Sequence, residues 1–385
     1  MEKKLVSVAR AILDIEPIEK SRALTAAAGT MKFAANEGLI GPSPKVHEAL
    51  IGLIREWQPG RQDGNKERKL KAKLSEYVSL PQDAISCFEN SRRALDYICR
   101  TYLEPGTEAL ICGAAENNLE IIASSLGAEV TQAHFETPFE PSIETLINLI
   151  RPRTKAIFID NPDGISGGMF TEAELVFLLA YAERTMVVVN EEYFEFSGCS
   201  VSDLVPRFPN LIVLRSFSRG FCLSELGLAY ILSDPENLEF INRSSRDDSP
   251  SMVLLTAALA ALDDMAFTKS YTALIEESKK ILADSLPEIG YEFQIAPANF
   301  LLLKVSNVDL AMELLNTENI ATKDLTAFDM PGLIRITLGN IRYADQLLMA
   351  LSRNAEKIAT GFNRNRGENS TNRLATHNRE MAGKR

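Results

Sequence analysis

The sequence predicts an α/β fold with a large, mostly parallel sheet covered by helices and a smaller C-terminal α/β domain. A chain of 385 residues exceeds the roughly 250 to 300 residues at which a single core stops growing, which favours two domains. Its 45% hydrophobic and 24% charged residues are typical of a globular protein that buries a core. Short apolar segments alternate with helical segments along most of the chain, and this order is typical of parallel strands joined by helices.

The first 40 residues predict an N-terminal helix followed by an arm. Met31 to Pro44 is rich in glycine and proline, which favours an extended conformation. A helix is then expected from Pro44 to Trp57, because proline is well suited to the first turn of a helix.

Residues 41–265 predict the large domain. The expected strands are Ala84 to Phe88, Ala109 to Cys112, Glu129 to Ala133, Lys155 to Asp160, Met186 to Asn190, Leu211 to Arg215 and Gly227 to Leu232. The helical segments between them include Ser91 to Tyr102, Asn118 to Leu126 and Glu172 to Glu183. In a sheet of this kind, ligands bind at the carboxyl ends of the strands.

Residues 266–358 predict the small domain. One long helix is expected to begin near Met252 and to run through Lys279, linking it to the large domain, with strands at Phe300 to Val305 and Leu333 to Leu338. Residues 359–385 contain six basic and two acidic side chains, few apolar residues and many asparagines. This composition predicts a disordered tail, with a weak docking arm as the alternative.

The net charge of −11 argues against general affinity for nucleic acid or an anionic membrane, because both attract basic surfaces. A small-molecule ligand is therefore expected. The sequence shows no signal peptide and no membrane span, which predicts a cytoplasmic protein. Its five cysteines are scattered and its three histidines lack metal-ligand spacing, so reduced thiols and no metal site are expected.

Several motifs stand in a fixed order along the chain. They are AANEGLIGPSP (Ala34 to Pro44), YLEPGTEALI (Tyr102 to Ile111), IFIDNPDGISGG (Ile157 to Gly168), VVVNEEYFEF (Val187 to Phe196), VLRSFSRGFCLSELGLAY (Val213 to Tyr230), ANFLLLKV (Ala298 to Val305) and LIRITLG (Leu333 to Gly339). In these motifs the chain resembles the histidinol-phosphate aminotransferase group of the class I/II aminotransferases, from about Phe33 to Leu351. The resemblance implies the fold-type-I architecture of enzymes that depend on pyridoxal phosphate (PLP).

The resemblance places Arg219 where the family keeps the lysine that forms an imine with the cofactor. The family pattern S-x-S-K-x-F reads SFSRGF here, from Ser216 to Phe221. A guanidinium group stays protonated in proteins and does not act as an imine-forming nucleophile at neutral pH. The resemblance thus implies a PLP site in which the family's reactive amine is missing, so use of the cofactor is doubtful.

Other cofactor positions of the family also differ. Asn190 stands where the D-E-A-Y motif has the aspartate that pairs with the pyridine nitrogen, and Glu116 stands where an aromatic residue stacks on the ring. Gly227 replaces a phosphate-binding arginine, and Gln58 replaces a tyrosine contributed by the partner subunit. The phosphate loop reads Asn90, Ser91, Arg92 and Arg93, and amide groups at a helix N-terminus still attract anions.

Other family positions are retained. The resemblance implies cofactor contacts for Asn161, Ser216 and Ser218, a catalytic position for Tyr193, and substrate binding by Arg335 and Asn36. Asn161 and Tyr193 equally fit a role in packing the strand ends. The acids Glu191 and Glu192 follow an apolar strand, so one of them could face the pocket.

Two interpretations of Arg219 remain open. In one it is a structural arginine in a salt bridge with Glu116 or Glu89. In the other it forms an anion pocket with Arg92, Arg93 and Arg335, because arginine forks suit phosphate and carboxylate groups.

These observations favour a diverged protein that binds an amino-acid-like or phosphorylated small molecule without standard transamination. One alternative is an active PLP-dependent aminotransferase with an unrecognised lysine elsewhere. Another is a non-catalytic partner subunit of an active paralogue. A homodimer is expected, as in the family, with a heterodimer as the alternative.

Overall fold

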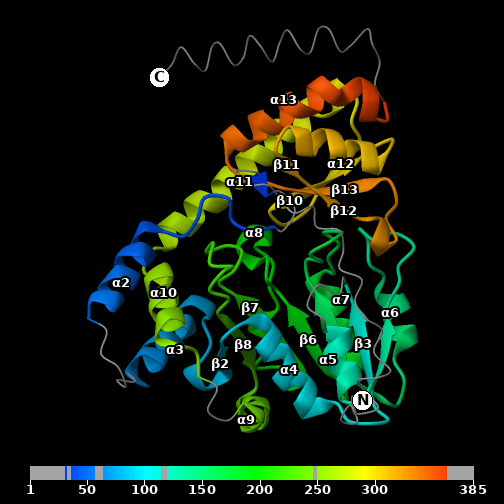
Figure 1. The fold of residues 1–385 in the computed structure, drawn as a ribbon. Coiled ribbons are helices and arrows are strands. Elements are labelled where there is room, and N and C mark those ends of the chain that lie inside the picture. The colour runs from blue at the N-terminus through cyan, green and yellow to red at the C-terminus, as the bar shows by residue number, and fades with distance from the viewer. Residues whose placement is uncertain (1–30, 33–35, 57–63, 114–118, 246–248, 362–385) are drawn as a thin grey trace, which may run out of the picture. The chain divides into compact units, whose positions relative to one another are not determined.

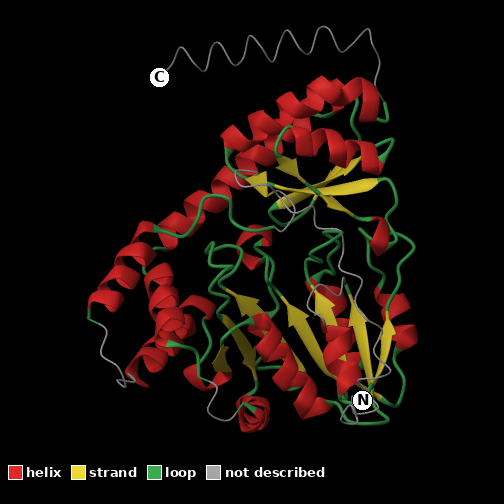
Figure 2. Ribbon diagram, viewed as in Figure 1, coloured by secondary structure: helices red, strands yellow, loops and turns green. Residues whose placement is uncertain are grey.

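The computed structural model describes residues 31–32, 36–56, 64–113, 119–245 and 249–361 (Figure 1). The described residues fall into two compact units. The first contains the described parts of Pro42–Gly164 and Gly168–Met265. The second contains residues 31–32 and 36–41, Ile165–Gly167, and the chain from Ala266 to residue 361. Each unit has its own sheet of four or more strands, shown as yellow arrows in Figure 2.

The first unit is built on a seven-stranded sheet with the order β2-β8-β7-β6-β5-β3-β4. Its strands are β2 (Ile85–Phe88), β3 (Glu108–Cys112), β4 (Glu129–Gln132), β5 (Thr154–Asp160), β6 (Met186–Asn190), β7 (Leu211–Ser216) and β8 (Ala229–Ser233). Only β8 runs antiparallel to the others, pairing with β7 on one side and β2 on the other. All seven predicted strands are confirmed, with small shifts at their ends.

The sheet separates two apolar cores, because successive side chains of a strand point to opposite faces. On β6, Val187 and Val189 belong to one core, while Met186 and Val188 belong to the other. This arrangement explains why the strand sequence MVVVN is apolar throughout rather than alternating. Helices cover both faces of the sheet (Figure 2).

The first core includes side chains of α3 (Gly64–Val78), α7 (Glu172–Tyr181) and α10 (Met252–Leu262). The second includes side chains of α4 (Ser91–Tyr102), α5 (Leu119–Ser125) and α9 (Pro235–Ser244). The unit also contains α2 (Pro44–Arg55), α6 (Ile143–Leu149) and the short α8 (Phe194–Ser197). The helices predicted over α2, α4, α5 and α7 are confirmed.

The second unit contains a four-stranded antiparallel sheet with the order β12-β13-β10-β9. Its strands are β9 (Phe293–Ile295), β10 (Phe300–Lys304), β12 (Lys323–Asp324) and β13 (Leu333–Thr337). Its helices are α11 (Met265–Ser285), α12 (Val308–Thr317) and α13 (Ile341–Ile358). The short strand β1 (Met31–Lys32) pairs in parallel with β11 (Ile320–Ala321), which attaches part of the predicted arm to this unit.

The prediction of one long helix from Met252 through Lys279 was wrong. The structure has two helices, α10 and α11, which are interrupted at Asp263 and Asp264. Asp263 is the C-cap of α10, and its backbone carbonyl accepts a hydrogen bond from Lys45 Nζ at 2.7 Å. Aspartate is a poor residue for a helix interior, since its side chain competes for backbone hydrogen bonds.

Residues 359–361, the first of the predicted disordered tail, are attached to the second unit. Ala359 forms an antiparallel bridge with Val305, and the Gly361 amide donates a 3.0 Å hydrogen bond to the Gly290 carbonyl. The rest of the predicted tail, residues 362–385, lies outside the described residues, as does the predicted helix before residue 31. Among the residues that the structure describes, no helix combines the length and apolar character needed to cross a membrane.

Candidate functional site

The parallel strands of the large sheet end at one edge, which we call the carboxyl edge. Asp160 and Asn190 are the last residues of β5 and β6, where they are register partners, and Ser216 is the last residue of neighbouring β7. The sheet register thus brings together two of the predicted cofactor positions, Asn190 and Ser216. The predicted ligand site is at this edge.

Asn190 is held by an acidic neighbour. Its Nδ2 donates a 2.8 Å hydrogen bond to Asp160 Oδ1, and the residue is only 8% exposed. Its Oδ1 is buried and has no hydrogen-bond partner among the described residues. A neutral amide here donates to the carboxylate of Asp160, whereas an aspartate would place two like charges side by side.

A second acid lies beside Asp160. A Cβ atom added to Gly113 would be 2.9 Å from Asp163 Oδ2 and 3.3 Å from Asp160 Oδ2, so both carboxylates border this glycine. Burial, together with the charges of Asp163 and Asp160, raises the pKa of the Cys112 thiol well above its usual value. The β3 and β5 side of the carboxyl edge is therefore acidic.

Arg219 contacts Glu192, two residues beyond the end of β6. Arg219 Nη2 lies 3.5 Å from Glu192 Oε2, and Ser216 Oγ donates to Glu192 Oε1 at 3.2 Å. The two charged side chains are 15% and 16% exposed. The structural interpretation of Arg219 predicted a salt bridge with Glu116 or Glu89; the ion pair found is with Glu192, while Glu116 lies outside the described residues.

The turn after β7 is fixed by its serines. The Ser218 amide donates to Ser216 Oγ at 3.2 Å, and Ser224 Oγ donates to the Ser218 carbonyl at 3.0 Å. Tyr193 is 3% exposed, and its ring centroid lies 5.5 Å from Arg219 Cζ. Tyr193 thus lies beside the turn that contains Ser216, Ser218 and Arg219, while the predicted roles of these residues stay predictions.

Asn161 closes the loop that follows β5. Its Oδ1 accepts from the Phe170 amide at 2.7 Å, and its Nδ2 donates to the Phe170 carbonyl at 3.2 Å. Both ends of the side-chain amide are therefore used within the protein. This geometry favours the packing role over the predicted cofactor contact.

The N-terminus of α4 supplies backbone donors at the carboxyl edge. Asn90 is its N-cap, and Asn90 Oδ1 accepts from the Arg93 amide at 2.9 Å. Ser91 is half-buried, while Arg92 and Arg93 are exposed. Gly227 lies alongside, because a Cβ added there would be 3.2 Å from Asn90 Cβ. The predicted phosphate loop therefore keeps the form of a capped helix start.

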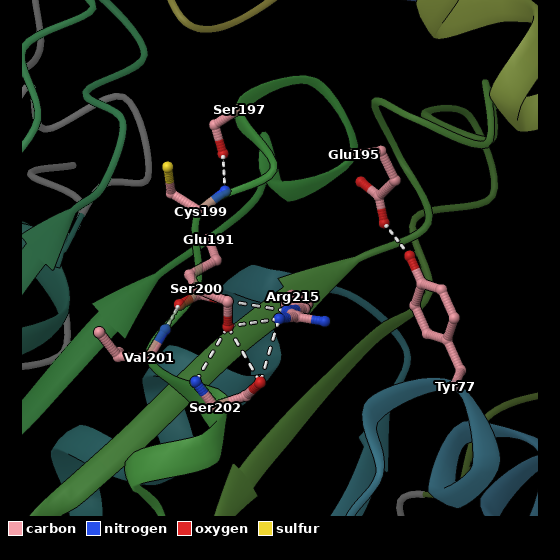
Figure 3. A network of polar contacts seen from close by, with 9 residues as sticks. All are labelled: Tyr77, Glu191, Glu195, Ser197, Cys199, Ser200, Val201, Ser202 and Arg215. Atoms are coloured by element: carbon pink, nitrogen blue, oxygen red, sulfur yellow. Dashed lines mark hydrogen bonds and ion pairs between the residues drawn. The ribbon is translucent and has the colours of Figure 1, made fainter. Parts of the chain in front are cut away.

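A buried ion pair lies behind this turn. Arg215 Nε donates to Glu191 Oε2 at 2.9 Å, and the side chains are 2% and 1% exposed. Figure 3 shows the serines around them: Arg215 Nη2 donates to Ser200 Oγ at 2.6 Å, and Ser200 Oγ donates to Glu191 Oε2 at 2.8 Å. Burial raises the pKa of Glu191, while Arg215 and these hydrogen bonds oppose the rise. Glu191 is therefore a structural anion rather than a residue free to meet a ligand.

Glu195 is the second acid of this network. Tyr77 Oη donates to Glu195 Oε1 at 3.1 Å, as Figure 3 shows. Burial raises the pKa of Glu195 to about 7, although Arg215 opposes the rise. No motif in the sequence singles out Glu195 or Tyr77, because only the folded chain brings Tyr77 of α3 next to Glu195 of α8.

The predicted substrate residues lie in the second unit. Arg335 on β13 is 1% exposed, and its Cζ lies 5.5 Å from the Phe300 ring centroid. Asn36 is buried, and its amide donates to Thr337 Oγ1 at 3.0 Å while its carbonyl accepts from Asn299 Nδ2 at 3.1 Å. Their predicted role in substrate binding stays a prediction. Gln58 lies outside the described residues.

Known proteins resemble this chain along most of its length. Residues 28–351 match the family model "Aminotransferase class I and II". A histidinol-phosphate aminotransferase from Anaeromyxobacter sp. is 29% identical over 88% of this chain and 94% of that relative. Histidinol-phosphate aminotransferase 1 from Thiobacillus denitrificans is 30% identical over 84% of this chain and 85% of that relative. A dihydroxyacetone phosphate transaminase from Campylobacter jejuni is 29% identical over 75% and 81% of the two chains.

Solved structures show the same fold. A histidinol-phosphate aminotransferase from Sinorhizobium meliloti, solved in complex with pyridoxal-5'-phosphate, superposes with a TM-score of 0.78 at 20% identity, covering 92% of this chain and 99% of that one. An aspartate aminotransferase from Thermotoga maritima superposes with a TM-score of 0.76 at 22% identity, covering 91% and 99% of the two chains. With a family model matched along most of its length, this chain belongs to the class I and II aminotransferase family.

Proposed function

We propose that this chain is a diverged member of the family, which binds an amino-acid-like or phosphorylated small molecule at the carboxyl edge without lysine-based transamination. The observation that carries the proposal is the contact between Arg219 and Glu192. At the position that the resemblance assigns to the imine-forming lysine, the chain has a guanidinium paired with a carboxylate. Such a pair offers one group for a ligand's anion and another for its ammonium.

The residues present do not fit a covalently held PLP cofactor. A guanidinium does not form the imine. Asn190 is a neutral amide engaged with Asp160, so it holds no negative charge against a pyridinium nitrogen. Gly227 offers no side chain to a phosphate, and its φ of +75° strains any residue with a side chain. Arginines and capped helix ends still bind anions non-covalently, which supports a binding role.

The experiment is to incubate the purified protein with PLP, record the visible absorbance of an imine, reduce with borohydride and map any adduct by peptide mass. We expect neither imine absorbance nor an adduct at a specific lysine. Thermal-shift screening of amino acids and phosphorylated metabolites then tests binding, since a ligand that prefers the native state raises its apparent stability. Arg219→Gln should abolish a positive shift, whereas Arg207→Gln, on the exposed surface, should preserve it.

The second candidate is an active PLP-dependent aminotransferase of an amino acid. The names and nearly full-length coverage of the histidinol-phosphate aminotransferase relatives favour it. A borohydride-fixed adduct on one specific lysine, together with amino transfer, would establish this candidate and remove the first.

A homodimer in the cytoplasm is part of the proposal, with a heterodimer with a lysine-bearing paralogue as its alternative. Light scattering of the purified protein should give twice the 42.6 kDa chain mass. Co-purification with a relative that carries the family lysine would support the partner-subunit alternative instead.

A further inference from the structure

Glu192 at the carboxyl edge is a second departure from the family pattern, and the replacement of the family lysine by Arg219 does not account for it. The family motif D-E-A-Y, which the resemblance places over residues 190–193, has an alanine where this chain has Glu192. The carboxylate of Glu192 accepts from Ser216 Oγ at 3.2 Å and contacts Arg219 Nη2 at 3.5 Å. Two departures from the family pattern thus meet as one ion pair.

The surroundings of this pair strengthen the electrostatic effect of the Glu192 carboxylate on a charged group beside it. Both side chains are about five-sixths buried, at 15% and 16% exposure, so water screens their attraction less than on an open surface. Ser216, itself 2% exposed, holds the carboxylate with its hydroxyl. This hydrogen bond holds Glu192 Oε1 without involving Arg219, which contacts the other carboxylate oxygen.

Imine formation needs a neutral amine. The nitrogen lone pair attacks the aldehyde carbon, a carbon–nitrogen double bond forms, and the aldehyde oxygen leaves as water with two protons from the amine. An ammonium group has no free lone pair and does not react. A carboxylate within about 4 Å favours the ammonium form and so raises the pKa of an amine beside it.

We infer that Glu192 is a second, independent barrier to imine chemistry at position 219. The inference rests on the proposed function and deepens it by naming a second residue, besides Arg219, that opposes covalent chemistry at this site. A lysine restored at position 219 stays protonated against Glu192 and remains unreactive. Only when the carboxylate is removed as well does the amine become available to an aldehyde.

The test uses the full-length protein with PLP as the aldehyde probe. The variants are Arg219→Lys, Glu192→Ala, Arg219→Lys/Glu192→Ala and Arg219→Lys/Glu192→Gln. The glutamine variant removes the charge and keeps the side-chain volume and an acceptor for Ser216, so it remains informative if the alanine variant does not fold. Thermal unfolding identifies the folded variants. Adducts at position 219 are fixed with borohydride and quantified by peptide mass, which is independent of any enzymatic activity.

We expect no adduct at position 219 in the wild type or in Glu192→Ala. Arg219→Lys alone should give little, and the two double variants should give at least about tenfold more at neutral pH, the factor that one pKa unit supplies. Equal labelling of Arg219→Lys and the double variants would overturn the inference, as would a folded double variant that gives no adduct. An adduct at another lysine of the wild type would overturn the proposed function instead, and the comparison at position 219 would still decide the role of Glu192.

Discussion

At the residue scale, two arginines four positions apart have opposite environments. Arg215 is 2% exposed and has Glu191 and two serine hydroxyls as hydrogen-bond partners, and its Cζ lies 3.6 Å from the Phe194 ring centroid. Breaking such a buried pair typically costs about 3 to 5 kcal/mol, because one charge is left uncompensated. Arg219 is more exposed, and its 3.5 Å contact with Glu192 is longer than a good charged hydrogen bond. Arg215 is therefore a structural residue of the fold, while Arg219 is held by a longer and more exposed ion pair.

Glu195 should make stability depend on pH near neutrality. Its pKa is raised from 4.5 to about 7, mainly by burial. Between these values the folded protein keeps a proton that the unfolded chain has released, so stability falls as pH rises through this window. Because Glu195 is only half-buried, solvent screens part of this effect, and we expect the free energy of unfolding to fall by about 2 kcal/mol across the window. Glu195→Gln should remove it, so the variant should gain stability relative to the wild type between pH 5 and pH 8 in urea unfolding.

The control for this prediction is Glu76→Gln, on the exposed surface of α3. It should leave the slope of stability against pH unchanged. Glu191, whose pKa burial also raises, is kept in all three proteins. Parallel pH profiles for the wild type and Glu195→Gln would refute the role assigned to Glu195.

At the scale of elements, the N-cap of α4 links helix stability to the candidate anion site. Asn90 Oδ1 satisfies the Arg93 amide at 2.9 Å. Asn90→Ala removes this acceptor and should cost about 1 kcal/mol in urea unfolding, whereas Asn90→Asp should keep the cap. If the alanine variant were as stable as the wild type, the cap would contribute nothing measurable.

The central strands of the first unit were predictable because burial on both faces leaves plain apolar runs, as in MVVVN of β6. The end of α10 was harder to predict. The apolar run that begins at Met252 and the helical pattern before Lys279 together predict one helix. The break depends on the side chains of Asp263 and Asp264, which compete for backbone hydrogen bonds, and on the hydrogen bond from Lys45 to the Asp263 carbonyl.

At the scale of the whole molecule, the sequence predicts where the candidate site lies but not which of its residues contact one another. The motifs put Arg219, Ser216 and Tyr193 at strand ends, and the parallel sheet then gathers them at one edge. The partner of Arg219 could not be predicted, since Glu192 and Glu89 are both acids that follow strands. The choice depends on strand order: β7 neighbours β6, whereas β8 separates it from β2.

The same limit applies to residues 359–361, because the composition from residue 359 onward predicts disorder although these three residues are attached to the second unit. Ile358 is fully buried, its carbonyl accepts from the Ser306 amide at 3.0 Å, and Ala359 bridges to Val305. A chain truncated after Gly361 should unfold at the wild-type temperature. Truncation after Lys357 removes the buried isoleucine and these backbone contacts and should cost about 2 to 4 kcal/mol, measured by urea unfolding. Equal stability of the two truncated proteins would show that α13 does not need the contacts of Ile358 and Ala359. A large loss of stability in the protein that ends at Gly361 would show that residues 362–385 contribute to the fold.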